Sequence, residues 1–418
     1  MTLGEVCDQV GGAIQTGPFG SQLHDSDYSI EGTPVVMPTN IVDGRISEDD
    51  IARIAPGHVQ RLQRHILRRG DIVYGRRGDI GRRAIVTDRE AGWLCGTGCI
   101  RVSLGDAILD PHFLFYYLGD SRVVAEIAAR AVGATMPNLN TSILRSVRVS
   151  FPRLPAQQRI ASILSTYDHL IENNARRIAV LEEMARRTFE EWFVHFRAPG
   201  CEGARMVDSP LGSMPRGWSA SSVGDATAYV SRGIAPIYDD NASALVINQK
   251  CIRGGRVSLN VARRQSKSVP DQKLVQQFDV LINSTGVGTL GRVAQIFEFP
   301  VGTTVDGHVT IARRSEGIDP DFFGLALLRL EEAFTAAGVG STGQTELGRE
   351  RIRQQALILP PVKMCAEFGS RVRPIRQLSH LLSVQIGNLR TQRDLLLPRL
   401  ISGELDVLSA PALKEAAE

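Results

Sequence analysis

The sequence has few cysteines, and they show no pairing pattern. Its six cysteines are scattered over 418 residues, and only Cys95 and Cys99 lie close together. No histidine or second cysteine pair lies nearby to complete a metal-ligand set, so we expect reduced thiols in a cytosolic protein. No run of about 18 apolar residues is present, which excludes an ordinary membrane-spanning helix. The first residues, "MTLGEVCDQV", lack the basic and apolar regions of a secretory signal, so we expect a cytoplasmic protein without membrane contact.

The common catalytic motifs are absent too. The sequence has no G-x-x-x-x-G-K-[ST] loop and no H-E-x-x-H motif, which argues against a Walker-type nucleotide hydrolase and a zinc peptidase. The eight histidines are dispersed and suggest no catalytic triad. The carboxylates of "FEEWF" (189–193) lie outside any glycine-rich segment, so we interpret them as exposed helix charges. We therefore predict no catalytic residue and no metal site on this chain.

One segment does match a cofactor-binding motif. Gly286, Gly288 and Gly291 in "STGVGTLGR" spell G-x-G-x-x-G directly after the strand-like "FDVLIN", with Asp306 at a suitable distance downstream. A dinucleotide site needs a helix to begin at the second glycine. Here "LGRVAQIFEFP" follows, with β-branched and aromatic residues and then Pro300, which predicts a second strand. We therefore predict a strand–glycine loop–strand hairpin, no cofactor on this chain, and DNA phosphates or base edges as the ligand of the loop.

The charge is small overall but concentrated in two segments. The net charge is +3. Residues 60–83 contain eight arginines and two acidic residues, Asp71 and Asp79. Residues 250–292 contain eight basic residues and two acidic ones, Asp271 and Asp279. Each segment therefore carries a net charge of +6. Two equal basic segments suggest two places of contact with an anionic polymer. The alternative is a solvated surface rich in arginine.

The chain contains an internal repeat with a period of about 208 residues, close to half its length. Both copies keep G-x-x-G-R, from Gly78 to Arg82 and from Gly288 to Arg292, at the exit of the predicted hairpin. The matched segments are 70–86 with 278–296, "LDPHFLFYYL" (109–118) with "IDPDFFGLAL" (318–327), "VGATMPNL" (132–139) with "VGSTGQTEL" (339–347), and 149–157 with 357–365.

A helix start is predicted at the same place in each copy. Asp110 and Asp319 suit the N-cap position, and the prolines that follow them, Pro111 and Pro320, suit the first helical turn. The surrounding segments contain short strand-like runs separated by Gly, Asp and Asn. Each globular part is therefore expected to be mostly β with a few helices.

Each copy ends in a long helical pattern. Core-type positions recur at steps of four and three from Ile160 to Trp192, and the positions 208 residues later form a second, mostly apolar stripe. Such stripes must be buried, and the simplest partner is the other copy, packed antiparallel. The residues predicted to pair the helices are Ile171, Asn174, Ile178, Leu181, Trp192, Leu382, Ile386, Leu389 and Leu396.

Polar residues and prolines interrupt this helical pattern. Asn174 lies at a core position, where an asparagine fixes the register of two helices; the alternative is a solvated defect. The first helix is predicted from Pro155 to about Phe196. Pro374 is expected to bend the second helix near its start, and Pro398 to end it.

These observations predict a mixed α/β protein of the α+β class. Two globular domains are joined by two long antiparallel helices that form a coiled coil, in an internal repeat with pseudo-two-fold symmetry. The predicted ranges are 1–153 for the first globular domain, 154–197 for the first helical spacer, 198–217 for a linker rich in Gly, Pro and Ser, 218–358 for the second globular domain, 359–407 for the second spacer and 408–418 for a flexible tail.

Two of these segments resemble a known protein family. "LPAQQRIASILSTYDHLIENNARRIAVLEEMARRTFEEWFVHFR" (154–197) closely resembles the central conserved region of the specificity subunits of type I restriction-modification systems. "RTQRDLLLPRLISGELDV" (390–407) resembles their distal conserved region, and "DIGRRAIV" and "GTLGRVAQI" resemble the hairpin of their target-recognition domains. The resemblance covers nearly the whole chain.

The resemblance implies a non-catalytic subunit that binds double-stranded DNA. Each recognition domain then reads one half of a split sequence in the major groove, and the paired helices set the spacer between the halves. The same helices dock two methyltransferase subunits, which use S-adenosylmethionine to methylate adenine at N6. Restriction subunits, which use ATP and Mg, join for translocation and cleavage. These cofactors belong to the partner subunits.

The residues predicted to contact DNA lie in the two hairpins and in matching loops after a strand. An adaptor that assembles proteins on its coiled coil without reading DNA sequence is the alternative function. The predicted DNA-binding residues are Thr39, Asn40, Arg76, Arg77, Arg82 and Arg83 in the first copy, and Gln249, Lys250, Ser284, Thr285 and Arg292 in the second.

Overall fold

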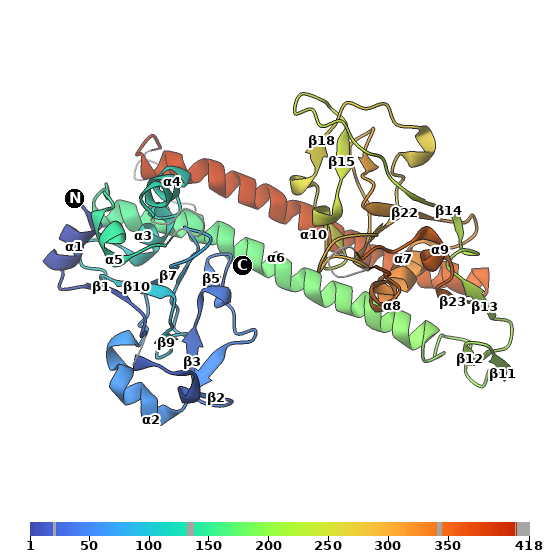
Figure 1. The fold of residues 1–418 in the computed structure, drawn as a ribbon, viewed down its shortest axis with the longest axis horizontal. Helices are drawn as coiled ribbons and strands as arrows, with labels where there is room; N and C mark the ends of the chain where they lie inside the picture. The colour runs from blue at the N-terminus through green and yellow to red at the C-terminus, as the bar shows by residue number, and fades with distance from the viewer. Residues whose placement is uncertain (20–21, 132–137, 341–344, 406, 408–418) are drawn as a thin grey trace, which may run out of the picture. The chain divides into compact units, whose positions relative to one another are not determined.

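The computed structural model describes residues 1–19, 22–131, 138–340, 345–405 and 407 of the chain (Figure 1). Contacts divide the chain into two compact units: unit 1 is Met1–Asn173 with Gln385–Glu418, and unit 2 is Asn174–Val384. Each unit therefore holds one globular domain and part of each of two long helices, α6 (Leu154–Phe193) and α10 (Val362–Ile401). None of the described helices is both long enough and apolar enough to cross a membrane.

Unit 1 is built on a four-stranded antiparallel sheet with the order β1 (Ala13–Thr16), β10 (Cys99–Ser103), β7 (Ile72–Gly75), β8 (Arg83–Ile85). A second sheet has the order β2 (Tyr28–Ser29), β6 (Ala52–Ile54), β3 (Thr33–Val36), β9 (Leu94–Cys95), and β4 (Ile41–Val42) pairs with β5 (Arg45–Ile46). The helices are α1 (Leu3–Gln9), α2 (Pro56–Val59), α3 (Pro111–Tyr117), α4 (Ser121–Arg130) and α5 (Thr141–Ser146), with 3-10 turns η2 (Asp25–Asp27), η3 (Pro38–Asn40) and η4 (Gln60–His65).

Unit 2 has a sheet of the same kind, with the order β14 (Thr227–Arg232), β22 (Val309–Arg314), β19 (Val280–Asn283), β20 (Val293–Gln295). The other strand groups are β18 (Arg263–Arg264), β15 (Leu245–Ile247) and β21 (Thr304–Val305); β16 (Ile252–Arg253) with β17 (Arg256–Val257); β11 (Met206–Ser209) with β12 (Gly212–Pro215); and β13 (Ser219–Ser222) with β23 (Ala356–Leu359). The helices are α7 (Pro320–Arg329), α8 (Glu331–Ala336) and α9 (Arg349–Arg353), with 3-10 turns η5 (Gln249–Cys251), η6 (Leu259–Val261) and η7 (Asp271–Lys273).

The two units repeat one topology, which confirms the predicted internal repeat. Strands β1, β10, β7 and β8 occupy the positions of β14, β22, β19 and β20, and the parallel pair β3–β9 corresponds to β15–β21. Both predicted helix starts are confirmed: the Asp110 carboxylate accepts from the Phe113 amide at 2.9 Å, and the Asp319 carboxylate accepts from two amides of α7. The predicted match of 132–139 with 339–347 lies largely outside the described residues.

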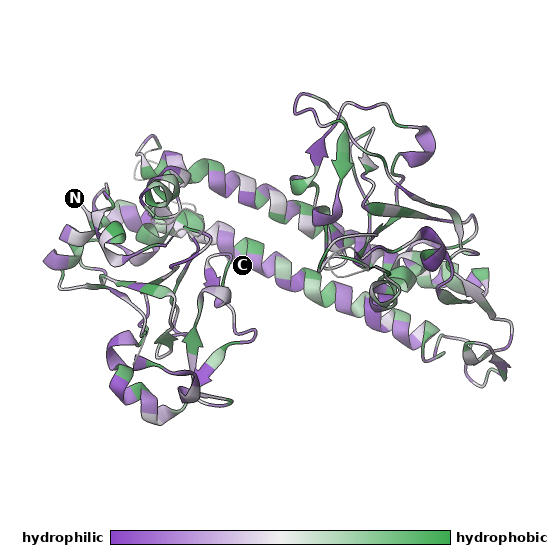
Figure 2. Cartoon of the chain, viewed as in Figure 1, coloured by the Kyte–Doolittle hydropathy of each residue, from purple (hydrophilic) through white to green (hydrophobic). Residues whose placement is uncertain are grey.

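The two long helices pack against each other within each unit, and they run antiparallel there. In unit 1, Ile160 and Leu164 share a core with Leu400, and Asp168 pairs with Arg393 at 2.5 Å. In unit 2, the rings of Phe189 and Trp192 lie 6.0 and 5.6 Å from the ring of Phe368, while Glu182 accepts from Ser379. In both units the residue numbers rise on α6 as they fall on α10. Figure 2 shows short apolar and polar bands alternating along both helices.

The residues predicted to pair the helices have the expected burial. Ile178, Trp192, Leu382 and Asn174 are buried, and the other five are half-buried. The five half-buried residues are Ile171, Leu181, Ile386, Leu389 and Leu396.

One expectation about the helices is wrong: Pro398 does not end α10, which continues to Ile401. Pro374 lies inside the same helix. The predicted linker, 198–217, contains the hairpin β11–β12, and its Met214 joins the core of unit 2.

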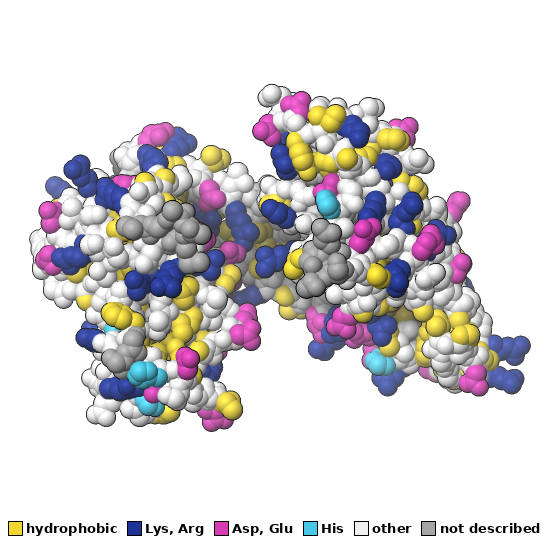
Figure 3. Space-filling model, viewed as in Figure 1, with side chains coloured by type: hydrophobic (Ala, Val, Ile, Leu, Met, Phe, Trp, Pro, Cys, Tyr) yellow, Lys and Arg dark blue, Asp and Glu magenta, His cyan; other side chains and the backbone are white. Residues whose placement is uncertain are grey.

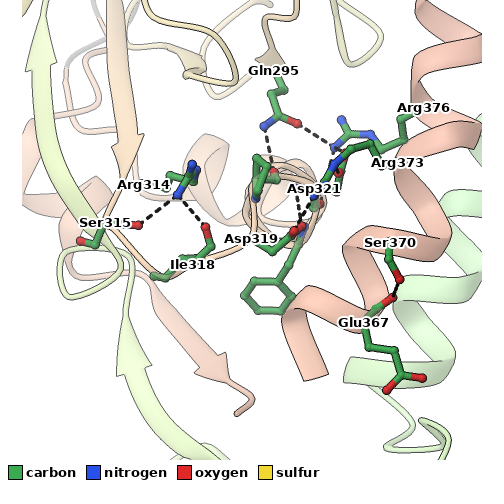
Figure 4. A network of polar contacts seen from close by, with 12 residues as sticks. Gln295, Arg314, Ser315, Ile318, Asp319, Asp321, Glu367, Ser370, Arg373 and Arg376 are labelled. Carbon is green, nitrogen blue, oxygen red and sulfur yellow. Dashed lines mark hydrogen bonds and ion pairs between the residues drawn. The ribbon is translucent and has the colours of Figure 1, made fainter. Parts of the chain in front are cut away.

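Polar side chains fix α7 onto α10 inside unit 2 (Figure 4). Arg373 donates to Asp319 at 2.6 Å and to Asp321 at 2.9 Å. Arg376 donates to the amide oxygen of Gln295 at 2.7 Å, and the Gln295 amide nitrogen donates to the Pro320 carbonyl at 2.9 Å. The start of α7 and the end of β20 are thereby held by one helix.

In unit 1, a single side chain of α6, Gln157, attaches the segment before α3 to that helix. The amide group of Gln157 on α6 accepts from the Asp110 amide at 2.8 Å and donates to the Ile108 carbonyl at 3.1 Å and the Pro152 carbonyl at 2.9 Å. Gln157 is buried, so these hydrogen bonds are shielded from water. Each globular domain is thus fixed to the helix segments of its own unit.

Candidate nucleic-acid interface

The hairpin β7–β8 carries two exposed arginines, Arg77 and Arg82. Arg77 is exposed, and Arg76 is half-buried with its Nε donating to the Leu139 carbonyl at 3.2 Å. Arg82 is exposed and donates to the Pro38 carbonyl at 3.2 Å, while Thr39 lies exposed next to that carbonyl in η3. The structure therefore brings the predicted residues of two separate loops together.

A cleft of about 790 Å³ opens beside this hairpin. The sequence did not single out most of its lining, because those residues come from β1 and the segment after it, from the segment before β10 and from the start of α5. The lining residues are Ile14, Gln15, Thr16, Phe19, Arg76, Arg77, Thr97, Gly98 and Thr141.

Two of the residues predicted to contact DNA in unit 1 point into the protein, and we remove them from the interface. The guanidinium of Arg83 donates to the Phe115 carbonyl at 2.8 Å and lies 4.7 Å from the centre of the Phe115 ring. Burial lowers the pKa of Arg83. The buried Asn40 side chain accepts from the Met37 amide at 3.0 Å and donates to the Asp49 carbonyl at 3.2 Å, so it stabilises its own turn.

The hairpin β19–β20 forms the equivalent surface of unit 2, and there polar side chains from three loops converge. The hydroxyl of Thr285, just after β19, lies 2.7 Å from Nδ1 of His308, just before β22. Gln249 in η5 reaches the same hydroxyl with its amide oxygen at 3.5 Å. Lys250, the next residue of η5, is exposed. His308 is a further candidate contact that the sequence did not reveal.

The other two predicted residues of unit 2 differ in their placement. Ser284 is fully buried, and its hydroxyl lies 2.6 Å from that of Thr310, so the prediction that it contacts DNA is corrected. Arg292 is half-buried, and its guanidinium donates to the Gly288 carbonyl at 2.9 Å. Arg292 therefore also closes the glycine loop on itself.

The glycines of the two loops serve packing and turn geometry. A Cβ on Gly81 would lie 2.9 Å from Val124 of α4, and a Cβ on Gly291 would lie 2.2 Å from the Thr335 hydroxyl of α8. Both glycines have positive φ, 116° and 82°. Each hairpin needs this glycine to pack closely on the following helix. Strand β20 follows the G-x-G-x-x-G segment, so the fold lacks the helix that a dinucleotide site would require.

A buried aspartate supports the base of each hairpin. Asp71 lies 3.8 Å from Arg101, and Asp279 forms a two-pronged pair with Arg313 at 2.8 and 2.9 Å. Burial raises the pKa of both carboxyls, and this effect outweighs the arginines, which lower it. These carboxylates also accept backbone amides, from Arg68 and Gln276 respectively, so they fix the turn that precedes each first strand.

Fewer basic side chains of the two +6 segments are available to bind an anion than their net charge suggests. Arg61 pairs with Asp27 at 2.5 Å, and Arg256 pairs with Glu182 at 2.5 Å. The guanidinium of Arg263 lies 3.4 Å from the centre of the Tyr238 ring. Figure 3 shows Lys and Arg side chains spread among polar and apolar ones rather than in one continuous basic surface. Part of each +6 segment therefore serves packing.

The described residues offer no evident place for a metal ion. In residues 1–19, 22–131, 138–340, 345–405 and 407, no three or more His, Cys, Asp or Glu side chains form a group that could hold one. All six cysteines are free, and burial raises the pKa of Cys95 to about 12.

Known proteins resemble this chain in sequence and in fold. Residues 1–183 match the family model described as the type I restriction modification DNA specificity domain. The chain is 27% identical to the type I restriction enzyme MjaIX specificity subunit of Methanocaldococcus jannaschii, over 84% of this chain and 81% of that protein. It is 21% identical to the type I restriction enzyme HindI specificity subunit of Haemophilus influenzae, over 84% and 89%. Its fold matches the crystal structure of the type I restriction-modification S subunit from M. genitalium, with a TM-score of 0.58, 16% identity, and coverage of 96% and 95%.

Proposed function

We propose that this chain, which resembles the specificity subunits of type I restriction-modification systems in sequence and in fold, selects a split DNA sequence for a cytoplasmic restriction-modification complex. Unit 1 reads one half of the target with the β7–β8 hairpin, η3 and the adjoining cleft. Unit 2 reads the other half with the β19–β20 hairpin, η5 and the segment before β22. The chain itself catalyses no reaction.

One observation carries this proposal: the same hairpin domain occurs twice, and the side chains at its loop ends differ between the copies. A repeated scaffold with different loops suits a protein that reads two different short sequences. Unit 1 presents Arg77 and Thr39, whereas unit 2 presents Thr285, Gln249 and Lys250; the arginine at the hairpin exit, Arg82 or Arg292, is common to both copies. Guanidinium, amide and hydroxyl groups are the usual partners of base edges and phosphates.

The partner subunits dock on the outward faces of the two long helices. The residues predicted from sequence to pair the helices are half-buried or buried, so they are not free to bind partners as well. Large apolar residues nevertheless remain exposed on both helices: Leu170, Val180 and Met184 on α6, and Leu378, Leu381, Val384 and Leu395 on α10. Exposed apolar side chains on both helices offer groups that a partner subunit could bury. We assign them to two methyltransferase subunits that bind S-adenosylmethionine and methylate adenine, with ATP- and Mg-dependent restriction subunits joining the same complex.

Reconstitution with the methyltransferase subunit of the same operon tests the proposal. Sequencing of modified bases in DNA from cells that carry both proteins should reveal one methylated sequence in two parts, separated by a spacer of fixed length. A nuclease footprint of the purified complex should show two protected segments. A single uninterrupted patch would contradict split recognition, and no protection at all would favour the alternative, an assembly adaptor that does not read sequence.

A further inference from the structure

The loop ends of unit 2 hold a polar cluster with an exposed histidine at its centre. Nδ1 of His308 lies 2.7 Å from the Thr285 hydroxyl, and that hydroxyl lies 3.5 Å from the amide oxygen of Gln249. These residues come from the end of β19, the start of β22 and the turn η5, which are distant in sequence. His308 is exposed, whereas Thr285 and Gln249 are half-buried beside it.

The backbone of His308 is fixed on both sides. Its amide donates to the Asp306 carboxylate at 2.9 Å, and its carbonyl accepts from the Ser284 amide at 2.8 Å. Asp306 is buried, so the turn that it closes is anchored in the domain. The carbonyl of Gln249 accepts from the buried Asn283 side chain at 3.0 Å, which fixes the position of η5 against β19. The ring of His308 is thus presented by a rigid frame, as a reading side chain requires.

One ring nitrogen is committed to this frame and the other is not. Nδ1 faces the Thr285 hydroxyl, and no partner of Nε2 is found among the residues that the structure describes. An exposed ring nitrogen is a hydrogen-bonding group of the kind that meets a base edge in the major groove. The Thr285 hydroxyl orients the ring, and the Asp306 carboxylate fixes the backbone that carries it.

Unit 1 provides an internal comparison at the same place. The Gly98 carbonyl accepts from the Arg76 amide, just as the His308 carbonyl accepts from the Ser284 amide, so Gly98 and His308 are equivalent. By the same register, Arg77 is equivalent to Thr285, since each forms an isolated antiparallel bridge just after the first hairpin strand. With glycine at this position, unit 1 has the cleft of about 790 Å³, which Gly98 and Arg77 line. Both units therefore share the same backbone arrangement at this position, but the side chain differs: glycine in unit 1 and histidine in unit 2.

We propose that His308, held by Thr285 and flanked by Gln249, reads a base edge in the half of the target bound by unit 2, and that this position determines the specificity of each unit. This inference rests on the proposed function and names the residue that performs it. In unit 1 this position is Gly98, which has no side chain to read a base. A side chain from another loop of unit 1 contacts the DNA there, or a different base is accepted.

The test compares the methylated sequence of complexes that contain the wild-type chain, His308→Ala or His308→Gly, the last of which gives unit 2 the residue of unit 1. Modified-base sequencing of host DNA, with binding assays on the wild-type target and on single-base variants of it, gives the readout. We expect one or two positions to become degenerate in one half of the target only. Discrimination at those positions should fall roughly 5- to 140-fold, the range that a base contact provides.

Three further variants separate reading from folding and assembly. Thr285→Val removes the hydroxyl with little change in shape, and it should weaken discrimination at the same positions because the ring is no longer oriented. His308→Gln keeps a hydrogen-bonding group and should shift the preferred base rather than only relax it. His195→Ala, an exposed histidine elsewhere in unit 2, should leave the sequence unchanged. Thermal melting and co-purification with the methyltransferase subunit should be the same for all variants.

The outcomes distinguish this inference from the proposed function. An unchanged methylated sequence for folded, assembled His308→Ala would overturn the role of His308 and leave the proposed function standing. Degeneracy in both halves of the target would also overturn it, because His308 belongs to unit 2 alone. A wild-type complex that methylates no split sequence would overturn the proposed function and this inference with it.

Discussion

At the scale of single residues, each hairpin depends on a buried ion pair at its base. The carboxylate of Asp279 is 1% exposed and the side chain of Arg313 16%. Arg313→Met should lower the free energy of unfolding by about 3–5 kcal/mol at pH 7, because it leaves a buried carboxylate without its counter-charge. Burial already raises the pKa of Asp279, and loss of Arg313 removes an effect that lowers it. The folded state then takes up a proton at a higher pH than the unfolded state, so the loss of stability should shrink as the pH falls through that raised pKa.

Urea denaturation at pH 7 and pH 5 measures this effect. Arg69→Met is a matched control, because Arg69 and its partner Asp88 are 72% and 79% exposed. An exposed pair of this kind contributes at most about 1 kcal/mol, at either pH. An equal loss for Arg313→Met at both pH values would show that lost packing, and not the buried charge, is responsible.

Burial of individual side chains is where prediction from sequence failed. Arg82 and Arg83, and likewise Ser284 and Thr285, are neighbours at the edges of a strand, where successive side chains point to opposite faces. The sequence shows that such a pair is polar but does not show which member faces inward. Arg83 and Ser284 face inward, against Phe115 and Thr310. A comparison of "GTGCIRV" (96–102) with "DGHVTIA" (306–312) would have drawn attention to His308, because it stands directly ahead of an equivalent strand where the first copy has Gly98.

At the scale of secondary-structure elements, the attachment of α7 to α10 depends on a glycine. A Cβ on Gly369 would lie 2.1 Å from the Asp319 carboxylate, which caps α7 and accepts from Arg373. Gly369→Ala should therefore destabilise unit 2 by at least about 1 kcal/mol, because an overpacking cost of about 1–3 kcal/mol and a weakened cap exceed the gain of about 1 kcal/mol in helix propensity.

Gly387→Ala in the same helix is the control. Nothing lies within 4 Å of a Cβ there, so only the helix propensity changes and stability should rise by about 1 kcal/mol. Denaturant unfolding of the two variants should thus give effects of opposite sign. A stabilising effect of Gly369→Ala would mean that the Asp319 carboxylate moves aside at little cost.

The elements that the sequence predicted well are those set by local chemistry. The Asp-Pro caps fix the starts of α3 and α7, and the heptad stripe places α6 within a few residues of its observed ends. Pro374 lies inside α10, where Val372 is buried in the core of unit 2 and Arg373 and Arg376 bind α7, so tertiary contacts support the helix around the proline. The hairpin β11–β12 was missed because its strands are short and its turn "SPLG" resembles a linker.

At the scale of the whole molecule, duplication separates the recognition of one half of the target from that of the other. The two sheets, the capped helices α3 and α7, and the buried Asp–Arg pairs are shared, whereas the exposed loop residues are not. In the proposed function, unit 1 and unit 2 contact different half-sites of the DNA. Changes in the two units should therefore act independently, since uncoupled sites contribute additively.

Salt dependence of DNA binding tests this independence. Arg77 and Lys250 are both exposed at the loop ends of their units, and their cationic side chains suit contacts to DNA phosphates. Arg77→Ala and Lys250→Ala should each weaken binding of the complex to its target and reduce the slope of log K against log salt by about 1, and the double variant should reduce it by about 2. Lys363→Ala, an exposed lysine on α10, should leave the slope unchanged. Titrations between 50 and 200 mM salt, about the range over which phosphate contacts are resolved, measure the slopes. A double variant with the slope of either single variant would show that the two units do not bind their half-sites independently.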